Sequence, residues 1–325
     1  MVQKILMIWE VKKTNLRNDM SYPDLPLSWF IIDNKLPDYK IKIKLGNNLT
    51  WLAIEGIKNP ESWFEDTIIC SKDKLLLRGI GNSLNQLLRV NSYTSYETGK
   101  EAVLTLSQNL KWKKSVKELA KRGKRNSVFE EIPYSDENVG RLNELRKNSR
   151  HSSAPELKYL FNNTFIPCMR LFVVKDNCEV WQGALLISKN NNHKYHSELL
   201  LKRKRSAAGI MEFLVTKTAE ILQSEKINEF SLGEVPFISI NLDNKLLNLL
   251  IHLFRPILKL SYNFSGLYFF KNKFNPTWHP VYLCSSKNIS LFTLFRLSIR
   301  TNFLRLIIHK IYVRIKYFFI LSNLF

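Results

Sequence analysis

Two lysines separated by one residue, Lys271 and Lys273, lie in an aromatic segment that could bind an anion. The segment covers residues 266–283, and its two prolines flank Trp278. Its apolar residues are too unevenly spaced for an amphipathic helix, so the pattern predicts a strand that enters a proline-bent loop. Alternate side chains of a strand point to the same side, which would hold both ammonium groups over one phosphate or carboxylate. A solvated edge strand, whose lysines only prevent pairing with another sheet, is the alternative.

The charge of the chain also points to an anionic partner. The 325 residues carry a formal net charge of +21, and the isoelectric point is about 9.8. This balance is typical of proteins that bind nucleic acid, a membrane surface or both, and charge alone does not choose between them. No Asp or Glu follows Asp243, whereas twelve Lys and Arg residues do. The C-terminal quarter is therefore expected to present an uncompensated cationic surface.

Other classes of protein fit the sequence poorly. The four cysteines, Cys70, Cys168, Cys178 and Cys284, form no CxxC pair, and the six histidines do not cluster at metal-ligand spacing. We therefore expect no metal site and no disulfide framework. A signal peptide is not visible, and no uncharged apolar window reaches the roughly eighteen residues that a spanning helix needs. These features predict a soluble or peripheral protein.

Hydrophobic periodicity and turn residues predict an α+β fold. In the first 91 residues we expect a short helix over 60–65 and strands over 5–9, 28–32, 39–45, 49–57 and 75–78. Further along we expect a strand pair over 92–107, helices over 112–122, 136–149 and 210–223, and strands over 127–132, 171–174, 180–188, 194–201 and 230–233. A hydrophobic segment over 246–260 is broken at Pro256. This order favours an α+β sandwich over a doubly wound parallel sheet.

Residues 288–320 interleave apolar and basic side chains at helical spacing. Pairs of like charge four residues apart, such as Arg296 with Arg300, slightly destabilise an isolated helix. Against anionic lipid the same pairs become favourable, because each basic side chain near such a surface contributes roughly 1 kcal/mol. The pattern indicates a basic amphipathic tail that binds a membrane reversibly. A helical tail packed on its own domain is the alternative.

Four stretches in the same order resemble the cytosolic C-terminal domain of the phosphatidylglycerol lysyltransferases, the multiple peptide resistance factors. They are Thr98–Leu106, His196–Leu200, Gly209–Leu214 with Leu232–Phe237, and Gly266–Leu283. The last is similar to the family signature Gly-Leu-x-x-Phe-Lys-x-Lys-Phe-x-Pro-x-Trp-x-Pro-x-Tyr-Leu. The resemblance covers residues 92–284, and it departs from the family pattern at Leu201, where an Arg is expected.

The resemblance implies tandem GNAT-like acyltransferase domains, with mixed sheets flanked by helices. On this basis residues 1–91 are the β-rich part of a first, shortened GNAT-like domain. Residues 92–284 are the family core with the second GNAT-like domain, and residues 285–325 are the basic amphipathic helical tail. The implied reaction moves an aminoacyl group from charged tRNA to a membrane lipid such as phosphatidylglycerol. The family enzymes usually carry a transmembrane flippase ahead of this domain, and this sequence contains none.

Transfer of an aminoacyl ester needs alignment, a proton acceptor and donors for the developing oxyanion, but neither ATP nor a metal. We assign Glu198 and Glu212 as candidate catalytic residues that hold the aminoacyl ammonium group or accept the hydroxyl proton. A salt bridge with basic neighbours is the alternative for Glu198. Lys271 and Lys273 are candidates for binding the lipid phosphate or the tRNA 3′ end. No cofactor is expected besides the aminoacyl-tRNA donor.

A basic quartet, residues 202–205, precedes the helix that is expected to begin near Gly209. Helix N-termini bind phosphates, and ordinary GNAT enzymes hold coenzyme A with a small-residue loop at this place, which residues 203–208 match weakly. We favour RNA phosphate as the partner of Lys202, Arg203 and Arg205. A solvated turn without a partner is the alternative.

The sequence therefore predicts an aminoacyltransferase that binds charged tRNA and the anionic inner face of the cell membrane from the cytoplasm. One alternative is a GNAT-type transferase that acts on a peptide, a peptidoglycan precursor or a small molecule, with or without coenzyme A. Another is a non-catalytic relative that binds RNA or membrane. The sequence leaves the donor amino acid, the acceptor and the oligomeric state open.

Overall fold

The computed structural model describes residues 23–46, 48–107, 110–149, 152–238 and 263–322. The strand expected at 5–9 and the hydrophobic segment at 246–260 lie outside these ranges. The described strands are β1 (Phe30–Ile31), β2 (Lys40–Gly46), β3 (Leu49–Ile57), β4 (Lys74–Ile80), β5 (Thr94–Thr105), β6 (Ser127–Ile132), β7 (Arg170–Asp176), β8 (Trp181–Asn191), β9 (Lys194–Lys202), β10 (Glu229–Pro236) and β11 (Thr277–Ser285). The described helices are a π-helical turn η1 (Glu65–Ile69), α2 (Asn82–Val90), α3 (Lys114–Lys124), α4 (Asp136–Lys147), α5 (Ile210–Ser224), α7 (Phe264–Asn272), α8 (Leu291–Arg300) and α9 (Phe303–Ser322).

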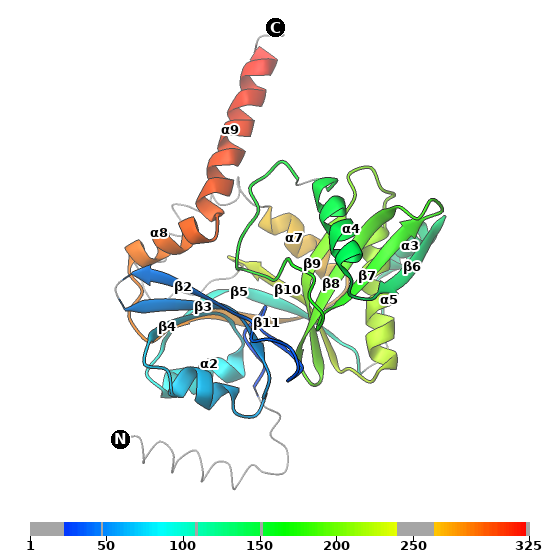
Figure 1. Cartoon of the computed structure of the whole chain (residues 1–325). Coiled ribbons are helices and arrows are strands. Elements are labelled where there is room, and N and C mark those ends of the chain that lie inside the picture. Colours follow the sequence, from blue (N-terminus) through cyan, green and yellow to red (C-terminus); the bar gives the residue numbers. More distant parts are fainter. Residues whose placement is uncertain (1–22, 47, 108–109, 150–151, 239–262, 323–325) are drawn as a thin grey trace.

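One mixed sheet organises the described chain (Figure 1), which confirms an α+β fold with helices flanking a mixed sheet. Its strand order is β1-β3-β4-β11-β5-β10-β9-β8-β7-β6, and β2 pairs with β3. The twelve-residue strand β5 lies antiparallel to both β11 and β10, so it connects the N-terminal and C-terminal strands of the sheet. The division into residues 1–91, 92–284 and 285–325, with tandem GNAT-like domains, stays a prediction.

Helices cover both faces of the sheet because the strand residues alternate between them. On β7, Leu171 and Val173 pack in the hydrophobic cluster that contains α4 residues Leu142 and Leu145. Their neighbours on β7 pack on the other side, in the cluster that includes the buried face of α5. Helices α3 and α5 meet at glycines, since a Cβ on Gly209 would lie 1.9 Å from the carbonyl oxygen of Leu119. This close approach fixes the N-terminus of α5 against the sheet.

Strands β9 and β10 run parallel, but they pair over only three residues each. The pairs join Lys194–His196 to Glu229–Ser231. Beyond His196, β9 continues along β8, whereas β10 continues along β5 after a register shift between Ser231 and Glu234. Gly233 lies in this irregularity with φ +86°, a conformation that other L-residues rarely adopt. The two strands therefore diverge and leave room between them.

The prediction of a strand that enters a proline-bent loop within residues 266–283 is wrong. The first part of this segment forms helix α7, and the part that contains Pro280 forms strand β11. Asn263 caps this helix, because its side chain accepts a hydrogen bond of 2.8 Å from the amide of Gly266. Within the helix Phe264 and Lys271 are buried about two turns apart, but the aromatic residues between them hide that period. Strand β11 begins only at Thr277. The two lysines therefore do not project from one face of a strand.

Near residue 90 the structure contains a helix that was not predicted, and one prediction fails. Residues 82–90 form helix α2, which begins after Gly81, a residue without a capping side chain. The strand pair expected over 92–107 is a single strand, β5. Gly99 does not mark a turn within it, since a Cβ there would lie 2.5 Å from the carbonyl oxygen of Val235. The glycine instead lets β10 approach closely.

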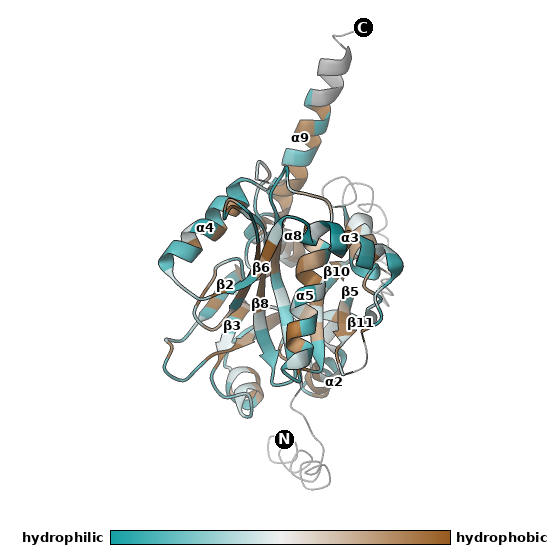
Figure 2. Ribbon diagram, turned by 90° about the vertical axis from the view of Figure 1, so that its right-hand side faces the viewer, coloured by the Kyte–Doolittle hydropathy of each residue, from teal (hydrophilic) through white to brown (hydrophobic). Residues whose placement is uncertain are grey.

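Residues 291–322 form α8 and α9, which occupy the region predicted as a helical tail (Figure 1). Hydrophobic and hydrophilic residues alternate along α9 (Figure 2). Within the described ranges, no helix has the length and apolarity required to cross a membrane. The lipid-binding role of this region stays a prediction.

Candidate functional site

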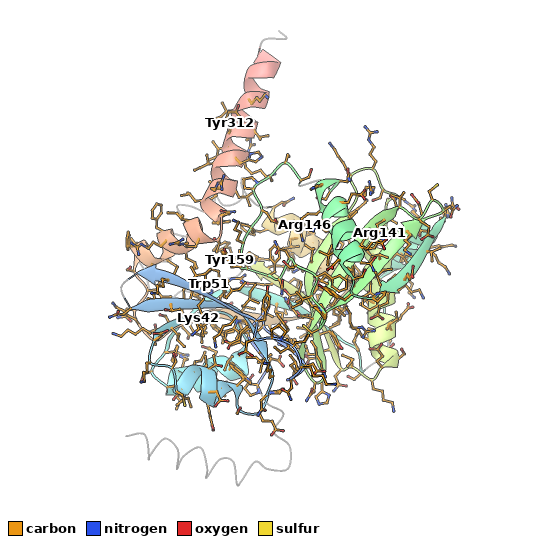
Figure 3. The ribbon with its side chains drawn as sticks, in the orientation of Figure 1. Lys42, Trp51, Arg141, Arg146, Tyr159 and Tyr312 are labelled. Atoms are coloured by element: carbon orange, nitrogen blue, oxygen red, sulfur yellow. The ribbon has the colours of Figure 1, made fainter. Side chains whose placement is uncertain are left out.

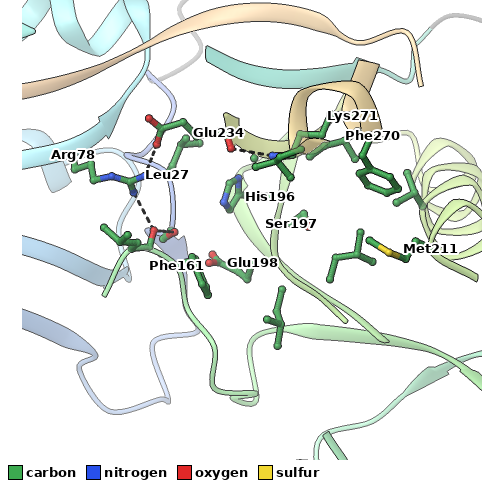
Figure 4. A pocket seen from close by; sticks show the side chains of 18 residues that line it. Leu27, Arg78, Phe161, His196, Ser197, Glu198, Met211, Glu234, Phe270 and Lys271 are labelled. Atoms are coloured by element: carbon green, nitrogen blue, oxygen red, sulfur yellow. Dashed lines mark hydrogen bonds and ion pairs between the residues drawn. The ribbon is translucent and has the colours of Figure 1, made fainter. Parts of the chain in front are cut away.

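A cavity of about 260 Å³ occupies the space where β9 and β10 diverge (Figure 4). Its walls come from seven parts of the fold: β9, β10, helices α5 and α7, Arg78 on β4, and the two loops around Ser28 and Leu160. The polar side chains that line it are Ser28, Arg78, His196, Ser197, Glu198, Glu234 and Lys271. Glu198 and Lys271, which sequence reasoning proposed as a catalytic and a binding residue, thus share one cavity.

Glu198 is buried on β9, with 4% of its surface exposed. Its carboxylate accepts a hydrogen bond from the Ser188 hydroxyl and one from the Asn162 amide, both 2.7 Å long. Burial nevertheless raises the pKa of Glu198 to about 7, although these hydrogen bonds favour the ionised form. A carboxyl group with this pKa can accept and return a proton near neutral pH, as a general base requires.

Lys271 lies in the last turn of helix α7 and is also buried. Its ammonium group donates a hydrogen bond of 3.0 Å to the carbonyl oxygen of Glu234. Burial lowers the pKa of Lys271 to about 7, against the opposing charges of Glu234 and Glu101. Gly233 leaves space beside this amine, because a Cβ there would lie 3.4 Å from Lys271 Nζ. The amine therefore has room to meet a substrate as a donor or as a cation.

His196 supplies a third polar group of the cavity. Its Nδ1 lies 3.1 Å from the Ser231 hydroxyl oxygen. Burial, reinforced by the charges of Lys194 and Lys271, lowers the pKa of His196 to about 3. The imidazole is thus neutral at physiological pH and can both donate and accept a hydrogen bond. Sequence reasoning included this residue in a motif but gave it no role.

Arg78 connects three segments of the cavity wall. Its guanidinium forms an ion pair with Glu234 and donates a hydrogen bond of 3.0 Å to the carbonyl oxygen of Leu160. The Ser28 hydroxyl donates to the same carbonyl over 3.1 Å. Thr98 in turn donates to the Glu234 carboxylate over 3.1 Å. Sequence reasoning missed this cluster, and its one local signal was an arginine at the end of a predicted strand.

The structure places the other two predicted residues of this region outside the lining of the cavity. Glu212 and Lys273 form an ion pair of 3.2 Å, and the Lys273 ammonium lies 5.9 Å from the Phe270 ring centre. Lys271 and Lys273 therefore bind different partners, and the prediction that they face one spot is wrong. Met211 and Val215, from the same helix as Glu212, do line the cavity.

The basic quartet follows β9 and is also separate from the lining of the cavity. Lys202 ends the strand, and Arg205 is exposed in the turn before α5. Arg203 is held by the chain itself, because it donates a 2.9 Å hydrogen bond to the Trp181 carbonyl and forms a 3.1 Å ion pair with Glu144. Lys202 and Arg205 remain available for an anionic partner.

The described residues contain no group of three or more His, Cys, Asp or Glu that could hold a metal ion. The four cysteines are unpaired. The cavity thus offers its chemistry through a carboxyl group, an amine, an imidazole and a guanidinium. This set suits proton transfer and the stabilisation of a negative charge, which are the needs of acyl transfer from an activated ester.

Comparison with known families decides the assignment. A family model described as phosphatidylglycerol lysyltransferase, C-terminal, matches residues 69–285. The chain belongs to this family. The matched range contains the four resembling stretches and, with β9, β10 and α7, most of the cavity wall. Family membership supports an acyltransferase.

Solved structures agree on the fold. L-PGS from Bacillus licheniformis superposes with a TM-score of 0.61 at 17% identity, over 83% of this chain and 87% of that chain. The C-terminal domain of a putative lysylphosphatidylglycerol synthetase from Agrobacterium fabrum gives a TM-score of 0.58 at 16% identity, over 82% and 85% of the two chains. A search of curated protein sequences found no match.

Proposed function

We propose that this member of the phosphatidylglycerol lysyltransferase family transfers an aminoacyl group from charged tRNA to a hydroxyl group of phosphatidylglycerol. The observation that carries the proposal is the buried pair of Glu198 and Lys271 in the cavity between β9 and β10. Both groups have a pKa of about 7. The similar structure from Agrobacterium fabrum is the C-terminal domain of a putative lysylphosphatidylglycerol synthetase, which supports an aminoacylated phosphatidylglycerol as the product.

In the proposed reaction the lipid hydroxyl oxygen attacks the carbonyl carbon of the aminoacyl ester. A new ester bond to the lipid forms, and the ester bond to the ribose of the tRNA breaks. The Glu198 carboxylate accepts the hydroxyl proton, which then passes to the ribose oxygen as it leaves. Lys271 and the neutral His196 can stabilise the negative charge that develops on the carbonyl oxygen. The step is balanced without ATP, a redox partner or a metal.

Charge supports the choice of partners. The net charge of +21 favours association with tRNA and with an anionic membrane. Lys202 and Arg205, in the segment between β9 and α5, are candidates for contacts with RNA phosphates, with Arg203 more constrained by Glu144. We propose that the protein acts in the cytoplasm, at the inner face of the cell membrane, without a cofactor.

The test measures transfer of a labelled amino acid from charged tRNA to phosphatidylglycerol vesicles, with each aminoacyl-tRNA in turn. We expect a labelled lipid that depends on intact tRNA and is lost in Glu198→Gln. Labelling of a peptide or a peptidoglycan precursor in place of the lipid would refute the proposed acceptor. Dependence on coenzyme A would identify an ordinary GNAT reaction. No product with any donor would favour a binding protein.

A further inference from the structure

A second cavity, which we call the basic cavity, lies beside the junction of α8 and α9. It has a volume of about 400 Å³ and is lined by Lys42, Ile43, Lys44, Lys158, Tyr159, Ile299, Arg300 and Asn302. Four of these eight residues are cationic, and none is acidic. Figure 3 labels Lys42 and Tyr159 below the α8–α9 junction. Four positive charges around one hollow repel one another unless an anion lies between them.

The charges of the basic cavity are largely uncompensated within the described chain. Lys44, Lys158 and Arg300 are exposed, and none of the three forms an ion pair with a described residue. Lys42 lies near Glu55, but that carboxylate pairs with Lys40. The acid closest in sequence to Lys158 is Glu156. Its carboxylate accepts a hydrogen bond of 2.9 Å from Asn163 and lies 3.5 Å from Arg146 Nε, so other partners already hold it.

Hydrogen bonds between its walls fix the shape of the basic cavity. The Lys158 amide donates to the Thr301 carbonyl, and the Asn302 side chain donates to the Glu156 carbonyl, both over 3.0 Å. Arg296 donates to the Leu45 carbonyl over 3.2 Å and thereby joins α8 to the end of β2. The backbone positions that carry the cations are thus fixed before any ligand binds, which reduces the entropic cost of binding.

Exposed apolar side chains on α8 and α9, which we together call the apolar face, include Ile299 of the basic cavity. On α8 the apolar face consists of Leu291, Phe292, Phe295 and Ile299, and on α9 of Ile308, Ile311, Tyr312 and Ile315. Leu294 and Leu297, on the other side of α8, pack against the hydrophobic core. The exposed side chains are therefore not needed to attach α8 to the sheet. Large exposed apolar side chains next to cations are typical of helices that bind a membrane interface.

We propose that the basic cavity binds the phosphate group of an anionic phospholipid, while the apolar face contacts the acyl region of the same bilayer. Ile299 belongs to both surfaces, so one lipid could contact both. RNA would also satisfy the cations, and its bases could stack on the exposed aromatic residues. It offers nothing to cover aliphatic residues such as Leu291 and Ile308, which are 53% and 58% exposed. The combination of charge and apolar surface therefore favours a lipid bilayer over RNA.

The position of the basic cavity would bring bound lipid close to the cavity that contains Glu198. Lys158 and Tyr159 line the basic cavity, whereas the next two residues, Leu160 and Phe161, line the cavity that contains Glu198. One short loop therefore forms part of both walls. Presentation of the acceptor lipid along this loop rests on the proposed function, but binding of the lipid at the basic cavity does not.

Vesicle binding tests the proposal with the full chain and without tRNA. The test variant is Lys44→Gln/Lys158→Gln/Arg300→Gln. The control, Lys114→Gln/Lys117→Gln/Lys121→Gln, removes the same charge from exposed positions on α3, which packs near β6 at the opposite end of the sheet.

Cosedimentation is measured with phosphatidylcholine vesicles that contain or lack phosphatidylglycerol. We expect the test variant to bind the anionic vesicles on the order of 100-fold more weakly, at roughly a fivefold loss for each cation. The control should change affinity by less than about threefold, because salt screens distant charges.

Further arms exclude loss of folding, a net-charge effect and RNA as the ligand. Lys44→Arg/Lys158→Arg should bind like the parent, and circular dichroism should be unchanged in every variant. Equal losses in the test and control triples, or a test variant with parental affinity, would overturn the proposal. So would a test variant that loses affinity for an oligoribonucleotide but retains affinity for anionic vesicles. If the vesicle results are as expected but the parent transfers no aminoacyl group, the proposed function is refuted and the proposed lipid site is still supported.

Discussion

Replacement of Glu198 by glutamine separates the chemical role of this carboxyl group from its cost to stability. Glutamine has nearly the same shape, and its amide oxygen can still accept the hydrogen bond from the Asn162 amide that Glu198 accepts. Its NH2 group can donate to the Ser188 hydroxyl, which reverses the hydrogen bond of the parent. We therefore expect the fold to persist. Loss of a general base should lower kcat for aminoacyl transfer about 100-fold to 10,000-fold.

The effect on stability follows from the pKa of Glu198, which rises from 4.5 to about 7 on folding. Between these values the folded state binds more protons than the unfolded state, so stability falls as the pH rises. The loss is complete once the pH exceeds the folded-state pKa. Each pH unit between the two values corresponds to about 1.4 kcal/mol, so the ionised carboxylate costs on the order of 3 kcal/mol at pH 8. Glutamine removes this term.

Urea denaturation, followed by tryptophan fluorescence at pH 5, 6.5 and 8, measures the difference. The free energy of unfolding of Glu198→Gln, relative to the parent, should increase by roughly 2 to 3 kcal/mol from pH 5 to pH 8. The control is Glu118→Gln on the exposed surface of α3, whose stability should run parallel to that of the parent. A variant that loses activity without this gain in the free energy of unfolding would refute the conclusion that the buried Glu198 carboxylate destabilises the fold. A stabilised variant with full activity would refute its role as a base.

Three further substitutions test other parts of the site and the sheet. Lys271→Met removes an amine whose folded-state pKa of about 7 lies below its ordinary value of 10.5. The contribution of Lys271 to parental stability should therefore rise from pH 7 to pH 10, and urea titrations should show this rise absent in the variant, together with a lower kcat. Arg78→Met leaves the buried Glu234 carboxylate without its ion-pair partner and should lower the free energy of unfolding by about 3 to 5 kcal/mol. Unchanged denaturation midpoints would contradict that ion pair. Gly99→Ala would place its Cβ 2.5 Å from the Val235 carbonyl oxygen and should destabilise the sheet by about 1 to 3 kcal/mol. The matched control is Gly140→Ala in α4, where no atom lies within 4 Å of the new Cβ. Thermal denaturation should show that this control stabilises the fold by up to about 1 kcal/mol. Similar effects at both positions would refute the close approach of β10.

Sequence patterns predicted the elements whose signals are local. Strand β6 has the predicted bounds, 127–132. Helix α4 begins after Ser135, whose hydroxyl accepts the 3.1 Å hydrogen bond from the Asn138 amide that the capping pattern predicts. The sequence did not predict helix α7, because aromatic residues fill the positions between its buried ones. β5 was predicted as a pair of strands, whereas Gly99 within it serves a close contact with β10 that only the tertiary structure reveals.

In the site, too, residues in local motifs could be predicted from the sequence, whereas residues joined by long-range contacts could not. Glu198 and Lys271 were found because they lie in stretches that resemble a family, and the structure places them in one cavity. Arg78 could not be found in this way, since its partners Leu160 and Glu234 are 82 and 156 residues away along the chain. The basic cavity likewise joins β2 to a junction more than 250 residues later. Such contacts follow from the strand order and not from any local pattern.

One physical cause accounts for the protonation properties of the cavity between β9 and β10. Burial disfavours charge on either kind of group, so it raises the pKa of Glu198 and lowers that of Lys271, and both arrive near 7. In water these two groups would differ by about six pH units, and a proton would remain on the amine. In this cavity either group can hold a proton at similar cost. A reaction that takes a proton from one alcohol and returns it to another needs such a balance, and this supports transfer between two hydroxyl oxygens over simple binding of an anion.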